Sequence, residues 1–403
     1  MADSPHTIAP ATRLVTAGRR AEWTGAAVNP PVWRASTHLY ANCAELSAGV
    51  RHNEDGRFFY GRRGAPTQWA LAEALTELEP GAAGTLLYPS GLAAIAFALM
   101  SVLRPGDELL IADNAYDPSR NLGRGWLTRL GIKARLFDPL DVAGFPGLIG
   151  PATRAVLLES PGSLTMEVAD FPSLAAAARA AGAAVIADNT WATPLGFAAL
   201  AHGADLAVLA LTKHVGGHSD LMLGSVTAAP AFIGPLRKAS QAFGQVAAPD
   251  DCALALRGLR TMGVRLERQT ETALAVARWL AGRVEVARVL CPMLPGSPGH
   301  DLWTRDFTGG SGLFTFVLRG GDAAARARFV DALTLFGIGY SWGGFESLVL
   351  PVDPAHDRDV TQWPLEGMDP RDRYAVRLSI GLEDVGDLIT DLERGFAAMN
   401  ASR

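Results

Sequence analysis

The stretch Ala184–Lys213, AVIADNTWATPLGFAALAHGADLAVLALTK, decides the fold. It contains two short apolar runs, AVIA at 184–187 and LAVLAL at 206–211. Apolar runs of this length are typical of strands that helices cover on both faces. Asp188 directly follows the first run, and Lys213 closely follows the second. The stretch therefore predicts a buried α/β sheet with polar groups at the ends of its strands.

The same alternation of strand and helix patterns extends from about Arg57 to Arg257. Such alternation predicts a largely parallel, doubly wound α/β sheet. Its further expected strands are Gly84–Tyr88, Glu108–Ala112 and Ala155–Leu158, and its expected helices are Pro66–Glu79, Gly91–Leu103 and Pro172–Ala181.

The pattern changes after about Arg260, where a smaller α+β domain is expected. Its elements are a connecting helix at Met262–Val284, strands at Ser311–Leu318 and Tyr374–Ser379, and a helix near Ala323–Phe336. A chain of 403 residues fits two or three domains. We expect an N-terminal arm at 1–56, a cofactor-binding α/β domain at 57–260 and a C-terminal α+β domain at 261–403.

Composition excludes several classes of partner. The net charge is −5, from 36 basic and 41 acidic residues, and no Lys/Arg run suggests nucleic-acid binding. The start of the chain lacks the basic-then-apolar order of a secretory signal, and stretches such as Gly91–Leu103 are too short to cross a membrane. Cys43, Cys252 and Cys291 lie far apart and are expected to be free thiols. We therefore expect a cytoplasmic protein without a membrane or nucleic-acid partner.

Several chemically useful groups follow the predicted strands. In open α/β sheets, ligands bind beyond the carboxyl ends of the strands. The groups expected at that edge are Asp188, Thr212, Lys213, Tyr116 and the Ser90-Gly91-Leu92 turn that opens a helix. An acid, an amine, an aromatic ring and a helix N-terminus should thus meet at one place.

This combination predicts a site for pyridoxal 5′-phosphate (PLP). The helix N-terminus at Gly91 suits the phosphate, because its N–H groups and dipole favour negative charge. Asp188 can keep the pyridine nitrogen protonated, which makes the ring a better electron sink. Lys213 supplies an amine for a Schiff base and for proton transfer. Thr212 can add a hydroxyl contact to the phosphate, and Tyr116 can stack on the ring.

Each of these residues alone has an ordinary structural explanation. An Asp after a strand is often a helix cap or turn former, and a lone Lys is usually at the surface. His214 and His218 flank the lysine at metal-like spacing, but two glycines separate them and no carboxylate pair completes a site. We therefore predict no metal, and the joint pattern rather than any single residue carries the PLP prediction.

The chain resembles the PLP enzymes of Cys/Met metabolism and, within that family, the bacterial cystathionine β-lyases. The resemblance spans about Val15 to Phe396. It rests on FYGRRGAPT (59–67), LESPGSLTMEV (158–168), DNTWATP (188–194), TKHVGGHSDLMLG (212–224), RGLRTMGVRL (257–266), YSWGGFESL (340–348) and RLSIGLEDV (377–385). It implies the fold-type-I, aspartate-aminotransferase-like fold of PLP-dependent transferases.

The resemblance also implies roles for individual residues. Within the subunit, Lys213 and Tyr116 would be catalytic, Asp188 would pair with the ring nitrogen, and Gly91, Leu92 and Thr212 would hold the phosphate. Tyr60 and Arg62 would reach the phosphate of a neighbouring subunit, in a homotetramer built from catalytic dimers. Arg377 would bind the substrate α-carboxylate, and Ser341 and Trp342 would line the substrate pocket. The alternative explanations are structural: Arg377 would be a surface residue on a strand, and Trp342 would be an aromatic residue of the core.

Departures from the wider family favour a β-lyase. Ser163 stands where γ-acting relatives commonly have Asn, and Trp342 stands where they tend to have Leu. The implied reaction is β-elimination on L-cystathionine to homocysteine, pyruvate and ammonia. At two other positions, those of His214 and Gln241, this chain also differs from some β-lyases. Cysteine or cystine desulfhydrase, cystathionine γ-lyase or γ-synthase, and a non-catalytic PLP-fold protein therefore remain alternatives.

Overall fold

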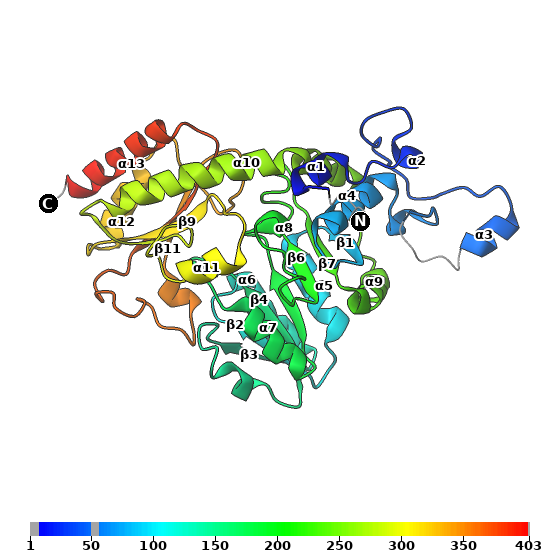
Figure 1. Cartoon of the computed structure of the whole chain (residues 1–403), viewed down its shortest axis with the longest axis horizontal. Coiled ribbons are helices and arrows are strands. Elements are labelled where there is room, and N and C mark those ends of the chain that lie inside the picture. The colour runs from blue at the N-terminus through cyan, green and yellow to red at the C-terminus, as the bar shows by residue number, and fades with distance from the viewer. Residues whose placement is uncertain (1–7, 50–55, 402–403) are drawn as a thin grey trace, which may run out of the picture.

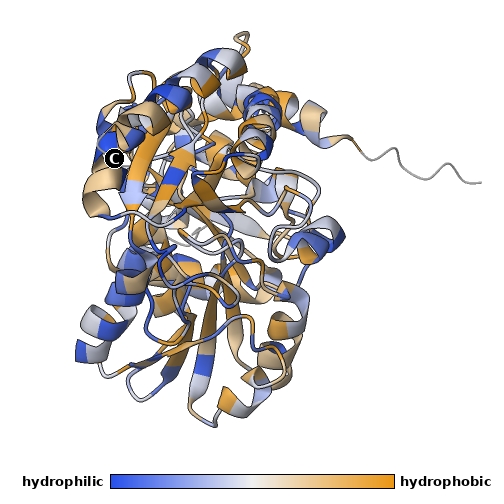
Figure 2. Ribbon diagram, turned by 90° about the vertical axis from the view of Figure 1, so that its left-hand side faces the viewer, coloured by the Kyte–Doolittle hydropathy of each residue, from blue (hydrophilic) through white to orange (hydrophobic). Residues whose placement is uncertain are grey.

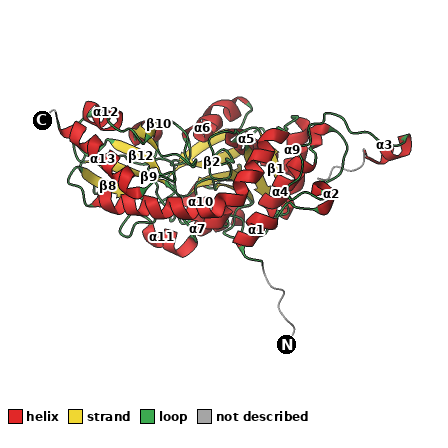
Figure 3. Ribbon diagram, turned by 90° about the horizontal axis from the view of Figure 1, so that it is seen from above, coloured by secondary structure: helices red, strands yellow, loops and turns green. Residues whose placement is uncertain are grey.

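The computed structural model describes residues 8–49 and 56–401. Two sheets lie along the long axis of the molecule, and a long helix, α10 (Pro249–Ala281), runs beside both of them (Figures 1 and 3). In Figure 1 the segment around α3 (Cys43–Gly49) projects away from the body of the molecule. None of the described helices is both long enough and apolar enough to cross a bilayer.

The larger sheet has seven strands and is mostly parallel, as the sequence predicts. Among the described strands, β7 pairs antiparallel with β1 and β6, and the other neighbours in this sheet pair in parallel. In spatial order the strands are β1 (Gly84–Tyr88), β7 (Gly224–Ala228), β6 (Leu206–Leu209), β5 (Ala184–Asp188), β4 (Thr153–Glu159), β2 (Glu108–Ala112) and β3 (Lys133–Phe137).

Apolar side chains cover both faces of this sheet. Leu110 and Val185 belong to one buried cluster, whereas Ile111 and Ile186, one position along each strand, belong to another. Because successive strand residues point to opposite faces, both faces must be covered, and the predicted apolar runs reflect this. Hydrophobic colours accordingly predominate along the strands in Figure 2.

The helices and short turns around the larger sheet include those that the sequence predicts. They are α4 (Pro66–Leu78), α5 (Gly91–Val102), α6 (Asp117–Asn121), α7 (Phe171–Ala180), α8 (Thr193–Gly196) and α9 (Pro230–Ala242), with the helical turns η1 (Gly61–Arg63), η2 (Leu122–Leu127) and η3 (Phe145–Leu148). The N-terminal residues add α1 (Pro10–Thr16) and α2 (Ala21–Thr24) to α3, so part of the expected arm is helical.

The second sheet has five strands and packs with helices of the C-terminal part. Its spatial order is β10 (Gly337–Ile338), β11 (Leu348–Val352), β12 (Ala375–Ser379), β9 (Leu313–Leu318) and β8 (Val286–Leu290). The accompanying helices are α11 (His300–Asp306), α12 (Ala323–Asp331) and α13 (Val385–Asn400), with the short turn η4 (Pro354–Asp357).

The connecting helix is longer than the sequence predicts. It begins at Pro249 rather than Met262 and ends at Ala281 rather than Val284. Pro249 takes an early helical position, and Asp250 and Asp251 stand in the first turn, where acidic groups favour the helix dipole. The proposed domain boundary at 260–261 therefore falls inside α10. We keep the division into 1–56, 57–260 and 261–403 as a prediction.

Candidate active site

One pocket lies between the carboxyl ends of the larger sheet and the C-terminal part. Its volume is about 350 Å³. Nine of the predicted site residues line it, and they come from both parts of the chain. These are Gly91, Leu92, Tyr116, Asp188, Thr212, Lys213, Ser341, Trp342 and Arg377. Tyr60 and Arg62 do not line it.

Lys213 lies in the turn after β6 and faces the C-terminal part. Its Nζ donates a hydrogen bond to Ser341 Oγ at 2.8 Å and lies 5.4 Å from the centre of the Trp342 ring. Burial and the nearby Arg377 charge lower the pKa of Lys213 to about 8, and Asp188 only partly opposes this. A neutral amine, which a nucleophile or base requires, is therefore accessible near neutral pH.

Asp188 is the last residue of β5 and opens into the pocket. Its Oδ1 accepts hydrogen bonds from both the backbone N–H (3.1 Å) and the hydroxyl (2.6 Å) of Thr190. Its Oδ2 accepts none from residues 8–49 and 56–401. Burial raises the pKa of Asp188, while the Thr190 hydrogen bonds and the Lys213 charge oppose the rise. A cationic ring nitrogen at Oδ2 would satisfy this carboxylate.

A second buried carboxyl group, Glu159, also lines the pocket. It ends β4 directly opposite Asp188 in the strand register, and its Oε2 accepts the backbone N–H of Tyr116 at 2.7 Å. Burial and the Asp188 charge raise the pKa of Glu159 well above its usual range. The sequence interpretation missed Glu159 as a functional candidate, although it ends an apolar strand in the same way as Asp188.

The N-terminus of α5 forms the far end of the pocket. The N–H groups of Gly91 and Leu92 belong to the first turn and have no acceptor within the helix. A Cβ on Gly91 would lie 2.7 Å from the Ala210 Cβ, so the close packing here requires glycine. Ser90 caps the helix by accepting the Ala93 N–H at 3.1 Å. An anion such as a phosphate group fits this end.

Thr212 and Tyr116 complete the predicted cofactor residues. The Thr212 hydroxyl donates to Leu223 O at 3.1 Å and accepts the Leu223 N–H at 3.0 Å. Its contact to a phosphate therefore stays a prediction. The Tyr116 side chain is half-exposed at the pocket wall, and its partial burial raises its pKa.

Arg377 lies on β12 and faces the pocket from the C-terminal part. Its Nη2 donates to Tyr340 O at 2.7 Å and to Ser341 O at 3.3 Å. Burial lowers the pKa of Arg377 to about 10, and Tyr116 opposes this, so the guanidinium stays charged at neutral pH. A planar cation held in this way suits a carboxylate.

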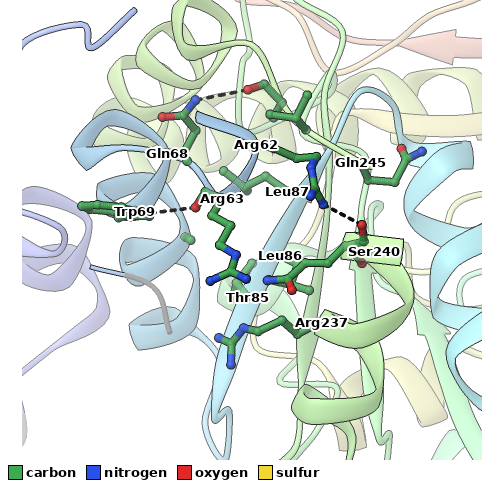
Figure 4. A pocket seen from close by; sticks show the side chains of 15 residues that line it. Arg62, Arg63, Gln68, Trp69, Thr85, Leu86, Leu87, Arg237, Ser240 and Gln245 are labelled. Carbon is green, nitrogen blue, oxygen red and sulfur yellow. Dashed lines mark hydrogen bonds between the residues drawn. The ribbon is translucent and has the colours of Figure 1, made fainter. Parts of the chain in front are cut away.

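His214 and the two remaining predicted residues lie elsewhere. His214 is buried, contacts Ser311 Oγ through Nε2 at 3.0 Å and packs edge-on against Trp342. No group of three potential metal-ligating side chains occurs within residues 8–49 and 56–401. Tyr60 is half-exposed, and Arg62 donates to Gln241 O at 2.7 Å in a separate pocket that Figure 4 shows.

The fold and the pocket define the class of this protein. The pocket pairs an amine of lowered pKa with an open carboxylate oxygen and an anion-binding helix end, on a mostly parallel sheet. This is the donor set that PLP requires, and the class is therefore that of PLP-dependent enzymes of fold type I.

The comparisons with known proteins narrow the class to a family. Residues 11–397 match the model of the Cys/Met metabolism PLP-dependent enzymes, and the chain belongs to this family. It is 43% identical over 389 residues to "Cystathionine beta-lyase MetC" of Escherichia coli, covering 96% of this chain and 98% of that protein. It is 44% identical over 373 residues to "Cystathionine beta-lyase" of Bordetella avium, covering 92% of each.

A solved structure has the same fold. The crystal structure of metB from Corynebacterium glutamicum superimposes with a TM-score of 0.86 at 28% sequence identity, covering 98% of this chain and 99% of that one. The family is PLP-dependent, and the residues in the pocket fit that cofactor.

Proposed function

We propose that this protein is a PLP-dependent carbon–sulfur lyase that cleaves L-cystathionine and water to homocysteine, pyruvate and ammonia. The observation that carries the proposal is the shared pocket of Lys213, Asp188 and Arg377, which would bring an amine, a ring-nitrogen partner and a carboxylate-binding group to one amino-acid substrate. The cystathionine β-lyases at 43–44% identity support the choice of substrate.

Bound PLP would supply an electron sink for the carbanion at the substrate Cα. Lys213 would be the residue that carries the cofactor and that later removes the Cα proton. Its pKa of about 8 favours this, because a base needs a substantial neutral fraction at working pH. Asp188 Oδ2 would hold the ring nitrogen, and Gly91, Leu92 and Thr212 would hold the phosphate.

The contacts with the substrate would determine which of its bonds breaks. Arg377 would bind the α-carboxylate with its planar guanidinium, and Tyr116 would pack on the ring and keep the Cβ–S bond aligned with the π system. Lys213 would pass the Cα proton to the departing homocysteine sulfur as the Cβ–S bond breaks. Hydrolysis of the remaining three-carbon fragment then yields pyruvate and ammonia.

Two residues in the pocket favour β-elimination over γ-chemistry. Ser163 and Trp342 both line it, at the positions where the sequence departs from γ-acting relatives. Cystathionine γ-lyase or γ-synthase activity is therefore the alternative within the family. Gln241 does not line the pocket, so it does not help to identify the far end of the substrate. Cysteine and cystine desulfhydrase activities are therefore further alternatives.

Product identification tests the proposal. The purified protein with PLP is incubated separately with cystathionine, cystine and homocysteine, and keto acids and thiols are identified by mass spectrometry. We expect pyruvate and homocysteine from cystathionine, whereas 2-oxobutyrate and cysteine would contradict β-elimination. Lys213→Ala should abolish turnover, and the matched control Lys133→Ala, at an exposed lysine, should retain it.

We further propose a cytoplasmic homotetramer built from catalytic dimers, with Tyr60 and Arg62 serving the neighbouring subunit. Tyr60 is half-exposed and Arg62 lies outside the shared pocket, which supports a role across a subunit boundary. Light scattering should give the mass of four chains of 42.5 kDa. Arg62→Ala should weaken PLP binding, and unchanged PLP affinity would contradict this role.

A further inference from the structure

The connection between β11 and β12 crosses from the second sheet to the larger one. In Figure 1 it descends, in orange, toward the region of α6 and β2. Residues 358–361 of this connection contact three separate segments of the larger-sheet part, through Asp113, Arg120 and the 163–165 loop. We call residues 358–361 the strap.

The first contact is with Asp113, which directly follows β2 and is fully buried. Its carboxylate accepts the backbone N–H groups of Asp359 (3.1 Å), Val360 (3.0 Å) and Thr361 (2.7 Å). It also accepts the Thr361 hydroxyl at 2.8 Å. Burial alone would raise the pKa of Asp113, but these hydrogen bonds outweigh it and lower the pKa. Asp113 is therefore a charged anchor for three consecutive backbone groups.

The second contact neutralises the buried charge. Arg120 is fully buried, and its Nη2 lies 2.6 Å from Asp359 Oδ2 and 3.9 Å from Asp113 Oδ1. Arg124 Nη1 also donates to Asp359 Oδ2 at 2.7 Å. Two carboxylates and two guanidinium groups thus alternate across the junction, and the buried pair Asp113 and Arg120 is compensated by the more exposed Asp359 and Arg124.

The third contact reaches the wall of the candidate active site. Arg358 Nη2 donates to Ser163 O at 2.6 Å and also contacts the Thr165 hydroxyl. Ser163 lines the pocket, and its N–H donates to Asn114 O at 2.8 Å. The strap, the Ser163 loop and the segment after β2 are therefore each hydrogen-bonded to the other two.

The segment after β2 also carries Tyr116. Asp113 precedes Tyr116 by three residues, and the intervening turn is closed by the Ala115 N–H to Ala112 O bond at 3.0 Å. At its other end the connection enters β12, which carries Arg377. The strap therefore links the ring-stacking candidate of one sheet to the carboxylate-binding candidate of the other.

We propose that the strap holds Tyr116 and the Ser163 loop in their working positions, and that Asp113 and Arg358 are positioning residues for the reaction. This inference rests on the proposed function, because it assigns these residues to the same pocket. Neither Asp113 nor Arg358 lines the pocket, so each would act through the residues that do.

Asp113→Asn tests the anchor, and Asp369→Asn is its matched control. Asp369 lies in the same connection but pairs with Arg371 at the surface. Hydrogen exchange on the PLP-loaded protein reports whether the strap is released: the amides of Val360 and Thr361 should exchange at least about tenfold faster in Asp113→Asn only, because their charged acceptor is lost. The control should exchange like wild type.

The visible circular dichroism of bound PLP then separates positioning from mere folding. The cofactor is optically active only through the orientation that the protein imposes, so displacement of Tyr116 should reduce or reshape this band in Asp113→Asn. We expect kcat to fall about tenfold, by loss of orientation. A variant with faster strap exchange and a lower melting temperature, but wild-type circular dichroism and kcat, would overturn the proposal.

Two milder variants decide the matter if Asp113→Asn does not fold. Thr361→Val removes one hydroxyl donor and should lower kcat roughly threefold with a smaller change in circular dichroism. Arg358→Met should raise KM about fivefold by loosening the Ser163 loop, and Arg358→Lys should partly restore it. Wild-type values in Thr361→Val and Arg358→Met would overturn the proposal.

The dichroism and exchange measurements use no substrate. If the wild-type protein does not cleave cystathionine while Asp113→Asn still changes the PLP band, the proposed substrate is wrong and the positioning role of the strap is supported. If the wild-type protein cleaves cystathionine and the PLP band of Asp113→Asn is unchanged, the proposed function is supported and the positioning role of the strap is wrong.

Discussion

Glu159 and Asp188 end neighbouring parallel strands at the same register, so two carboxyl groups border one pocket. Their proximity means that the second ionisation is costly in a buried site. The pKa of Glu159 is raised well above its usual range by burial and by Asp188. Burial and the Asp188 charge therefore both favour the neutral form of Glu159, which accepts the Tyr116 N–H.

Glu159→Gln should preserve activity, because an amide mimics the neutral acid that the raised pKa favours and keeps an acceptor for the Tyr116 N–H. We expect kcat/KM within about threefold of wild type, whereas Glu159→Ala should lose about fivefold, equivalent to one hydrogen bond of about 1 kcal/mol. Steady-state kinetics on the PLP-loaded variants measure this. A large loss in Glu159→Gln would mean that the ionised carboxylate is required.

The same pair predicts how stability depends on pH. Between the usual and the raised pKa of Glu159, the folded protein binds more protons than the unfolded chain, so stability falls as pH rises through this window. Glu159→Gln lacks this loss and should gain stability relative to wild type as pH rises through this window. Urea unfolding of the PLP-free protein measures the difference, with exposed Glu366→Gln as control. A constant difference across this range would contradict the assignment.

Lys213 should react with PLP as an amine of unusually low pKa. Its pKa of about 8 predicts that the rate of PLP uptake by the PLP-free protein rises with pH and levels off above about pH 8. Arg377→Met removes a charge that lowers this pKa and should move the inflection to higher pH. Stopped-flow absorbance measures the rate. A rate that still rises toward pH 10, as expected for an ordinary lysine, would contradict the lowered pKa of Lys213.

Ser341→Ala should slow turnover more than it weakens substrate binding. The Ser341 hydroxyl accepts the Lys213 Nζ hydrogen bond at 2.8 Å and so orients the amine. Losing a hydrogen bond to a charged group is worth about 1.5–3 kcal/mol, and we expect at least about a tenfold lower kcat. A change confined to KM, measured with saturating PLP, would instead make Ser341 a substrate-binding residue.

Much of this site could be predicted from sequence, because covered parallel strands appear as apolar runs and their ends locate Asp188. The loop that carries Lys213 was less predictable. β6 ends at Leu209 rather than Leu211, since the Ala210 N–H donates to the Thr190 hydroxyl instead of to a neighbouring strand. The strap could not be predicted, because backbone N–H groups that converge on Asp113 leave no periodic pattern in the sequence.

Two glycines of α10 should respond oppositely to alanine. A Cβ on Gly258 would lie 2.2 Å from Gly216 O and 2.3 Å from Val215 O, in the backbone that follows Lys213. This backbone must move to admit a methyl group, so Gly258→Ala should destabilise the protein by about 1–3 kcal/mol or more, as overpacked sites do. It should also weaken PLP binding.

Gly263 provides the matched control on the same helix. A Cβ there would meet only the Leu14 Cδ1, at 3.1 Å, which is the end of a flexible side chain. Since alanine favours a helix over glycine by about 1 kcal/mol, Gly263→Ala should leave stability unchanged or raise it and should bind PLP like wild type. Urea unfolding and PLP titration of both variants measure the contrast. Equal effects at the two positions would mean that the Lys213 loop does not rest on Gly258.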